Sequence, residues 1–183
     1  MTTRKGNQET FNNEKIWKGF YTVSFLVGLV LLVFEITIYR KTIIDIYIPI
    51  SIILVVGLLT FYLNRDHYKK TYALKGNFFP VIQNLFSWGA ISCYIVMATN
   101  YYSADKITTE YQFQIKEKSS MPGRKYHRNE RQPLVRIDYF GFEKELVFRY
   151  ADTEKVNKAD SIRVTVRKGR LGFDILKDYE VIN

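Results

Sequence analysis

The densest group of chemically versatile side chains is a basic segment at residues 124–131, which we call the basic loop. Guanidinium and ammonium groups beside an aromatic ring, here Tyr126, are residue types that bind phosphate or nucleotides. The same cations suit anionic lipid headgroups, and we favour that interpretation because the segment is typical of a solvated loop. The cations of the basic loop are Arg124, Lys125, Arg128 and Arg131, with His127 among them.

A second basic cluster lies nearer the C-terminus. Its members are Arg163, Arg167, Lys168 and Arg170. If the fold brings this cluster and the basic loop to the same end of one domain, the two together form a candidate anion site.

Glu35 is a carboxylate inside a long apolar segment. A charge in lipid is costly, so such a residue is a functional candidate by default. It precedes Tyr39 by about one helical turn, roughly 6 Å along a helix axis. We therefore expect Glu35 to reach the membrane interface and to pair with Arg40 or Lys41. The alternatives are a place in an ion path or a site of helix pairing.

Signatures of metal binding and nucleophilic catalysis are missing from the sequence. The two histidines, His67 and His127, have no His or Cys at ligand spacing. The motifs H-E-x-x-H, G-x-S-x-G, C-x-x-C and the P-loop do not occur. Cys93 is the single cysteine, which excludes an intramolecular disulfide. We predict that the chain is not an enzyme and uses no metal or cofactor.

Three apolar segments must position these residues. They cover residues 19–39, 43–63 and 78–102, and a helix of roughly 20 apolar residues crosses a bilayer core. Ser24 and Gly28 have the small-xxx-small spacing that lets another helix approach closely. In the third segment, Gln83, Asn84 and Ser87 share one helical face, which favours hydrogen bonding within a bundle.

The formal net charge of the chain is +9, and no nucleic-acid recognition motif accompanies it, so we expect no nucleic-acid partner.

The Lys and Arg residues in the short segments that flank the spans predict the orientation of the chain in the membrane. The first connector carries two cations, Arg40 and Lys41, whereas the polar tail 1–18 and the second connector carry four each. These eight are Arg4, Lys5, Lys15, Lys18, Arg65, Lys69, Lys70 and Lys75. The N-terminus is therefore expected in the cytoplasm, and residues 103–183 outside it.

Residues 103–183 have the period-two alternation of half-buried strands. Tyr111, Phe113 and Ile115 alternate with polar residues, and Gly141 marks a hairpin turn. About five short strands predict a small β-barrel or rolled sheet of the OB or SH3 kind, which makes the whole chain an α+β membrane protein. A few spanning helices followed by a small β domain resemble the layout of the membrane-anchored OB-fold proteins of the NfeD type. This resemblance lies in the order of elements, and a fold alone does not fix a function.

Three functions are compatible with this layout. The first is an integral membrane protein whose membrane-proximal β domain binds or scaffolds a partner at the bilayer surface, either another protein or a second copy of the chain. The second is a ligand-gated signalling effector whose β domain is cytoplasmic and senses an anionic small molecule. The third, which we favour least, is a small transporter or channel subunit that uses Glu35.

Overall fold

A computed structural model describes residues 3–123, 125 and 128–182. The chain forms two compact units. The helical unit comprises residues 1–39 and 45–99, and the β unit comprises residues 40–44 and 100–183. The predicted α+β class is confirmed. The connector between the first two helices belongs to the β unit, although the sequence placed it with the helices.

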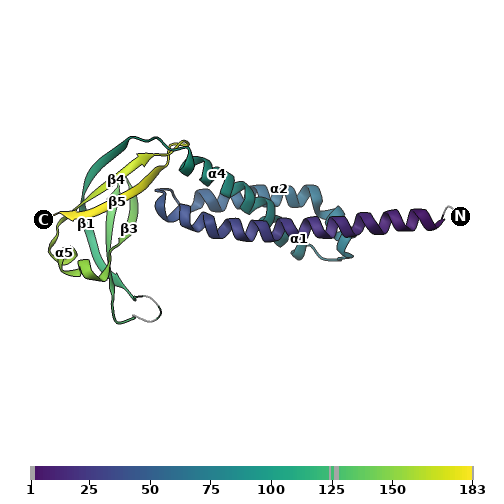
Figure 1. The fold of residues 1–183 in the computed structure, drawn as a ribbon, viewed down its shortest axis with the longest axis horizontal. Coiled ribbons are helices and arrows are strands. Elements are labelled where there is room, and N and C mark those ends of the chain that lie inside the picture. Colours follow the sequence, from purple (N-terminus) through teal and green to yellow (C-terminus); the bar gives the residue numbers. More distant parts are fainter. Residues whose placement is uncertain (1–2, 124, 126–127, 183) are drawn as a thin grey trace. The chain divides into compact units, whose positions relative to one another are not determined.

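The helical unit contains three helical stretches that lie side by side (Figure 1). They are α1 (Thr3–Lys41), α2 (Tyr47–Tyr72), and a third stretch of α3 (Phe78–Asn84), the π-helical turn η1 (Leu85–Gly89) and α4 (Ala90–Tyr102). Segments of 29, 26 and 25 residues within them are long and apolar enough to cross a membrane. This confirms the three predicted spans in number and composition. The first two helices extend beyond the predicted spans, because residues 3–18 join α1 and residues 64–72 join α2. The third stretch has the predicted bounds, residues 78–102.

Local chemistry sets the bounds of α2. The Asp45 Oδ1 atom accepts a hydrogen bond from the Tyr47 N–H at 2.9 Å, and the Asp45 carbonyl accepts one from Ile48 at 3.1 Å. These bonds satisfy N–H groups that have no partner inside the helix. At the other end, Ala73 adopts a left-handed conformation with φ 52°, and its N–H donates to the carbonyls of the last turn.

The three helical stretches approach most closely around η1. A Cβ atom added at Gly28 of α1 would overlap the Phe86 carbonyl oxygen, and one at Gly57 of α2 would lie 2.6 Å from the Leu85 side chain. One added at Gly89 would lie 2.6 Å from the Ile53 carbonyl oxygen. The close approach predicted from Ser24 and Gly28 is confirmed, and its partner is the third helix.

The outer surface of the helical unit is apolar. Val23, Val33, Val55 and Leu59 are each more than half exposed. Exposed aliphatic side chains in such numbers would be unfavourable in water but suit a hydrocarbon solvent. Length, composition and this surface together indicate membrane association.

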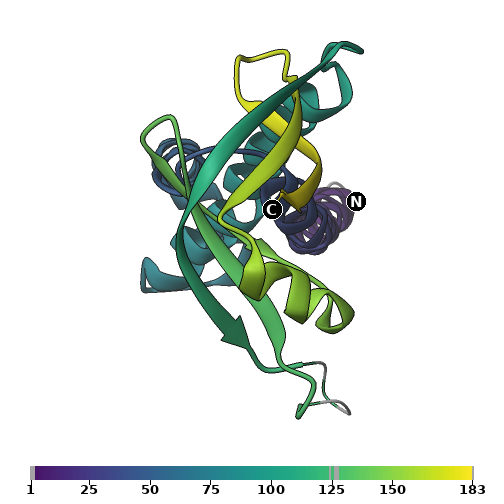
Figure 2. The same cartoon turned by 90° about the vertical axis from the view of Figure 1, so that its left-hand side faces the viewer.

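The β unit is a five-stranded antiparallel sheet in the order β3-β2-β1-β4-β5. The strands are β1 (Thr108–Met121), β2 (Gln132–Tyr139), β3 (Phe142–Val147), β4 (Ser161–Lys168) and β5 (Asp174–Ile182). A short turn η2 (Tyr150–Asp152) and the helix α5 (Thr153–Lys158) connect β3 to β4. Figure 2 shows how strongly β1 twists along its length.

The sheet is open, so the predicted barrel is wrong. The N-terminal half of β1, up to Gln114, pairs with β4, and the half from Ile115 pairs with β2. The hairpins β2–β3 and β4–β5 therefore follow one another along β1, and in the described residues β3 and β5 form no ladder. The Tyr179 hydroxyl of β5 donates a hydrogen bond to the Val147 carbonyl of β3 at 2.6 Å. Alternation of apolar residues predicts that one face of the sheet is buried. Because open and closed sheets both have such a face, alternation does not distinguish a barrel from an open sheet.

One continuous core contains buried side chains of β2, β3 and β4, with partly buried side chains of β1 and β5 packed against it. It also takes in Val156 from α5 and Ile43 from the first connector. The fully buried members include Val135, Ile137, Leu146, Ile162 and Val164. Contact between strands and connector in a single core makes residues 40–44 an integral part of the β unit.

Candidate functional site

The two basic clusters lie at opposite ends of β1. Arg167 is opposite Thr108, the first residue of β1, whereas Met121, its last residue, is opposite Gln132. A strand of 14 residues at ~3.3 Å per residue spans about 45 Å. The basic loop and the second cluster therefore do not form one anion site.

Arg163 is neutralised in the middle of the sheet. Its Nη1 atom lies 2.9 Å from Glu180 Oε1, and its Nε atom lies 3.8 Å from Glu110 Oε2. Two neighbouring cations have the same arrangement: Arg136 lies between Glu117 and Glu145, and Lys116 lies between Asp138 and Glu143. The Lys116 ammonium and the Gly141 N–H hold the pKa of Asp138 below its usual value. We call this the charge-compensated middle of the sheet.

The other members of the second cluster lie where β4 ends. The Arg167 Nη2 atom donates to the Tyr101 carbonyl at 2.9 Å, and its guanidinium lies over the Tyr101 ring at 5.4 Å. Its Nε atom is buried without a hydrogen-bond partner among the described residues. Lys168 and Arg170 are exposed. These cations are thus next to the aromatic pair that closes the third apolar segment.

Asn100 holds the turn between β4 and β5. Its Nδ2 atom donates to the Phe173 carbonyl at 3.1 Å, and its Oδ1 atom accepts from the Leu171 N–H at 3.0 Å. Its own carbonyl accepts from the Arg170 N–H at 3.3 Å. A Cβ atom added at Gly169 would overlap both Asn100 and the Phe173 carbonyl, so only glycine lets the turn approach Asn100 this closely.

The first connector binds the same part of the sheet. Thr42 forms a β-bridge with Ile175, and the Ile43 N–H donates to the Asp174 carbonyl at 2.8 Å. The Lys144 ammonium donates to the Thr42 carbonyl at 3.1 Å, and burial lowers the pKa of this lysine. From β2, the Tyr139 hydroxyl donates to Asp174 Oδ2 at 2.8 Å.

These contacts define what we call the attachment end of the β unit: residues 40–44, residues 100–102 and the turn 168–175. Sequence reasoning missed Thr42, Asn100 and Lys144 as joining residues. Asn100 alone carried a signal, because it is a polar residue at the end of an apolar segment. At the tip of the turn, Leu171 is 47% exposed beside Arg170.

Glu35 lies inside the helical unit. Its side chain is 6% exposed, and the Cys93 thiol donates to its Oε1 atom at 3.0 Å. The same sulfur lies 3.5 Å from the Pro49 carbonyl. Glu35 Oε2 is buried without a hydrogen-bond partner in the part of the chain that the structure describes. This arrangement joins α1, α2 and α4, which is the helix-pairing alternative that the sequence left open.

The polar face of the third segment is buried as predicted. The Gln83 Nε2 atom donates to the Tyr21 carbonyl of α1 at 2.6 Å, which is the expected interhelical bond. Asn84 and Ser87 bond instead to carbonyls of their own helix, those of Pro80 and Gln83. The face therefore contributes one hydrogen bond between helices and two within a helix.

The basic loop is described in part, since Arg124, Tyr126 and His127 lie outside the described residues. Lys125 and Arg128 are exposed. Arg131 bonds to Ser120, with Nε donating to the hydroxyl at 2.8 Å and Nη2 donating to the carbonyl at 2.9 Å. Among the described cations of this loop, Arg131 is therefore oriented by a neutral residue.

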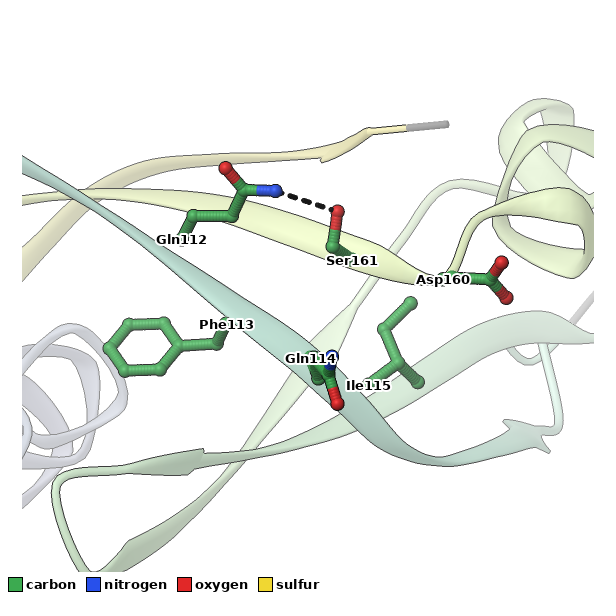
Figure 3. Close-up of a pocket in the computed structure, with 6 residues that line it drawn as sticks. All are labelled: Gln112, Phe113, Gln114, Ile115, Asp160 and Ser161. Carbon is green, nitrogen blue, oxygen red and sulfur yellow. Dashed lines mark hydrogen bonds between the residues drawn. The ribbon is translucent and has the colours of Figure 1, made fainter.

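We consider two open grooves among the described residues of the β unit. The larger, about 670 Å³, lies where β1 separates from β4 and includes Gln112, Ser161 and Asp160 (Figure 3). Its Gln112 Nε2 and Ser161 Oγ atoms are hydrogen bonded at 3.1 Å. The smaller, about 420 Å³, lies beside the basic loop and includes Arg131 and Lys118. Among the described residues, no group of three or more His, Cys, Asp or Glu is placed to hold a metal ion.

The chain matches no known protein-family model, no curated protein and no solved structure. The physical basis for a function is therefore the attachment end, the groove beside the basic loop, and the buried Glu35.

Proposed function

We propose that this chain is a multi-pass membrane protein that holds its β unit at one surface of the bilayer, as a fixed platform for a protein partner or a second copy. One observation carries the proposal: the first connector and the end of the third apolar helix bind the same β4–β5 turn. Thr42 and Ile43 bond to Ile175 and Asp174, and Asn100 bonds to Phe173 and Leu171.

Chain connectivity supports a membrane location for the attachment end. Residues 40–44 follow the first proposed span directly, and residues 100–102 close the third. In a chain that crosses three times, these two segments emerge on the same side. Residues 40–44 and residues 100–102 both contact the β4–β5 turn. These shared contacts are what a third segment that crosses the membrane once would produce. The distribution of cations favours the extracytoplasmic side for the β unit, with the N-terminus in the cytoplasm.

The residues of the attachment end suit a headgroup layer. Lys168 and Arg170 are exposed cations, and each contributes about 1 kcal/mol of attraction near an anionic surface. Leu171 and Tyr102 supply exposed apolar and aromatic surface of the kind that anchors proteins at the interface. The headgroup role expected of the basic loop therefore suits the second cluster better, because Arg167 already bonds to Tyr101.

Fluorescence quenching from labelled lipid tests this orientation. The variants Arg170→Cys and Ser119→Cys, each in a Cys93→Ser background, are labelled with the same fluorophore and reconstituted into vesicles that contain headgroup-spin-labelled lipid. We expect stronger quenching at position 170 than at position 119, because the two positions lie near opposite ends of β1. Vesicles without spin label provide the control for each site.

Equal quenching at the two positions, or stronger quenching at position 119, would refute the orientation. Both positions are exposed, so labelling itself does not decide the outcome. Since Cys93 bonds to Glu35, the background variant is first compared with the unmodified chain for thermal stability.

A further inference from the structure

Two cations at the far end of the sheet, beyond the charge-compensated middle, bond to neutral groups: Lys118 and Arg131. The Lys118 ammonium donates to the Asn157 carbonyl of α5 at 2.9 Å, and Arg131 donates to the hydroxyl and carbonyl of Ser120. Arg136 and Arg163, in contrast, each contact two carboxylates. A cation that bonds to a neutral acceptor keeps its full charge available to an anion.

These two cations belong to the wall of the smaller groove. Its other lining residues are Ser119, Ser120, Asn129, Pro133, Tyr150, Thr153 and Asn157. Hydroxyl, amide, ammonium and guanidinium groups thus dominate the lining, and none of the described lining residues is a carboxylate. The larger groove has the opposite character, with Asp160 in its wall and no cation among the described residues that line it (Figure 3).

The walls of the groove are held in place by bonds within the β unit. Lys118 links β1 to α5, and Arg131 links the end of the basic loop to β1. At the base of the η2–α5 segment, the Thr153 hydroxyl bonds to the Tyr150 carbonyl at 2.5 Å. A site whose donors are already oriented loses less conformational entropy when it binds.

We propose that this groove binds the phosphate group of a small phosphorylated molecule. A guanidinium offers paired N–H donors that match phosphate oxygens, an ammonium adds a point charge, and hydroxyl and amide groups complete the donor set. The exposed Arg128 beside the groove adds to the positive field that attracts anions. This inference is independent of the orientation proposed for the attachment end, because it depends on the opposite end of β1.

Binding of inorganic pyrophosphate to the full-length protein tests the proposal. The protein is placed in nanodiscs of zwitterionic lipid, so that anionic headgroups do not compete, and titrated calorimetrically. We expect saturable binding that weakens about tenfold for each cation removed in Lys118→Gln and Arg131→Gln. Arg131→Lys keeps the charge but loses the paired donors, and is expected to fall between the unmodified protein and Arg131→Gln.

A matched control removes the same charge at the other end of the sheet. The double variant Lys168→Gln/Arg170→Gln should bind pyrophosphate as the unmodified protein does, whereas Lys118→Gln/Arg131→Gln should not. Equal loss in both double variants would show attraction by net charge alone and would overturn the proposal, as would the absence of saturable binding to the unmodified protein.

Anionic vesicles separate the two sources of phosphate. If the full-length protein bound headgroups of added anionic lipid through Lys118 and Arg131 but did not bind pyrophosphate, the groove would be a lipid site and the proposal would be wrong. Unchanged thermal midpoints of the groove variants establish that lost binding is not lost folding.

Discussion

Gly28→Ala is expected to destabilise the helical unit by about 3 kcal/mol, the upper end of the range for overpacking a core. The added methyl group would overlap the Phe86 carbonyl oxygen and lie 2.8 Å from the Phe86 carbonyl carbon. Backbone atoms cannot rotate away as the end of a flexible side chain does, so α1 must separate from η1. The gain in helix propensity from glycine to alanine, up to about 1 kcal/mol, is too small to offset this.

Cys93 provides the measurement for this prediction. The thiol is fully buried, so its reaction with a fluorogenic maleimide during heating in mild detergent reports opening of the helical unit. Gly19→Ala is the matched control, because it lies in the same helix and an added Cβ atom there has no neighbour within 4 Å. Equal thermal midpoints for the two variants would contradict the close contact between α1 and η1.

Asn100→Ala is expected to open the attachment end. The change removes two side-chain hydrogen bonds to the β4–β5 turn and leaves the Leu171 N–H and the Phe173 carbonyl without these partners. Losing one such bond costs about 1–3 kcal/mol when the partner stays buried, so the turn should open at least about tenfold more often. Cleavage by trypsin after the exposed Arg170 should accelerate by a similar factor.

Thr99→Ala serves as the control for Asn100→Ala. Thr99 is the adjacent residue, is exposed, and has a hydroxyl that bonds to the Ile95 carbonyl of its own helix. We expect the trypsin cleavage rate of this variant to equal that of the unmodified protein. If Asn100→Ala and Thr99→Ala were cleaved at the same rate, Asn100 would not hold the turn, and the support for the attachment end would fall.

Local patterns in the sequence predicted the elements but not how they join. Runs of apolar residues identified three spans, and alternation around Tyr111 and Phe113 identified strands, because both signals come from neighbouring residues. The bridge between Thr42 and Ile175 connects distant parts of the chain, and no local period encodes it. Closure of the sheet likewise depends on where the hairpins lie along β1, which alternation does not specify.

For the candidate site residues too, the sequence predicted local position but not the contacts with distant parts of the chain. Counting residues gave the position of Glu35 along its helix, but it did not predict toward which neighbouring helices the Glu35 side chain points. Ser24, Gly28 and Glu35 have the spacing of one helical face, and that face packs inside the bundle, as the contacts of Gly28 and Glu35 demonstrate. Arg163 was grouped with Arg167 by proximity in sequence, yet its side chain lies between Glu110 and Glu180 on neighbouring strands.

The sidedness of three exposed positions tests the central proposal most directly. Cysteines are introduced singly at Lys41 in the first connector, Asn77 in the second connector and Ser119 in the β unit, each in a Cys93→Ser background. Each is exposed in the structure. A membrane-impermeant thiol reagent is then added to intact cells whose outer envelope, where present, has been made permeable.

We predict that positions 41 and 119 react in intact cells, whereas position 77 reacts only after the cytoplasmic membrane is permeabilised. This result requires the first connector and the β unit to share one side of the bilayer, as their common turn implies. If only position 77 reacted in intact cells, the β unit could still be a platform at the bilayer surface, but it would lie in the cytoplasm. If only one of positions 41 and 119 reacted in intact cells, the result would contradict the attachment of the β unit to the first connector. It would also contradict the proposed function.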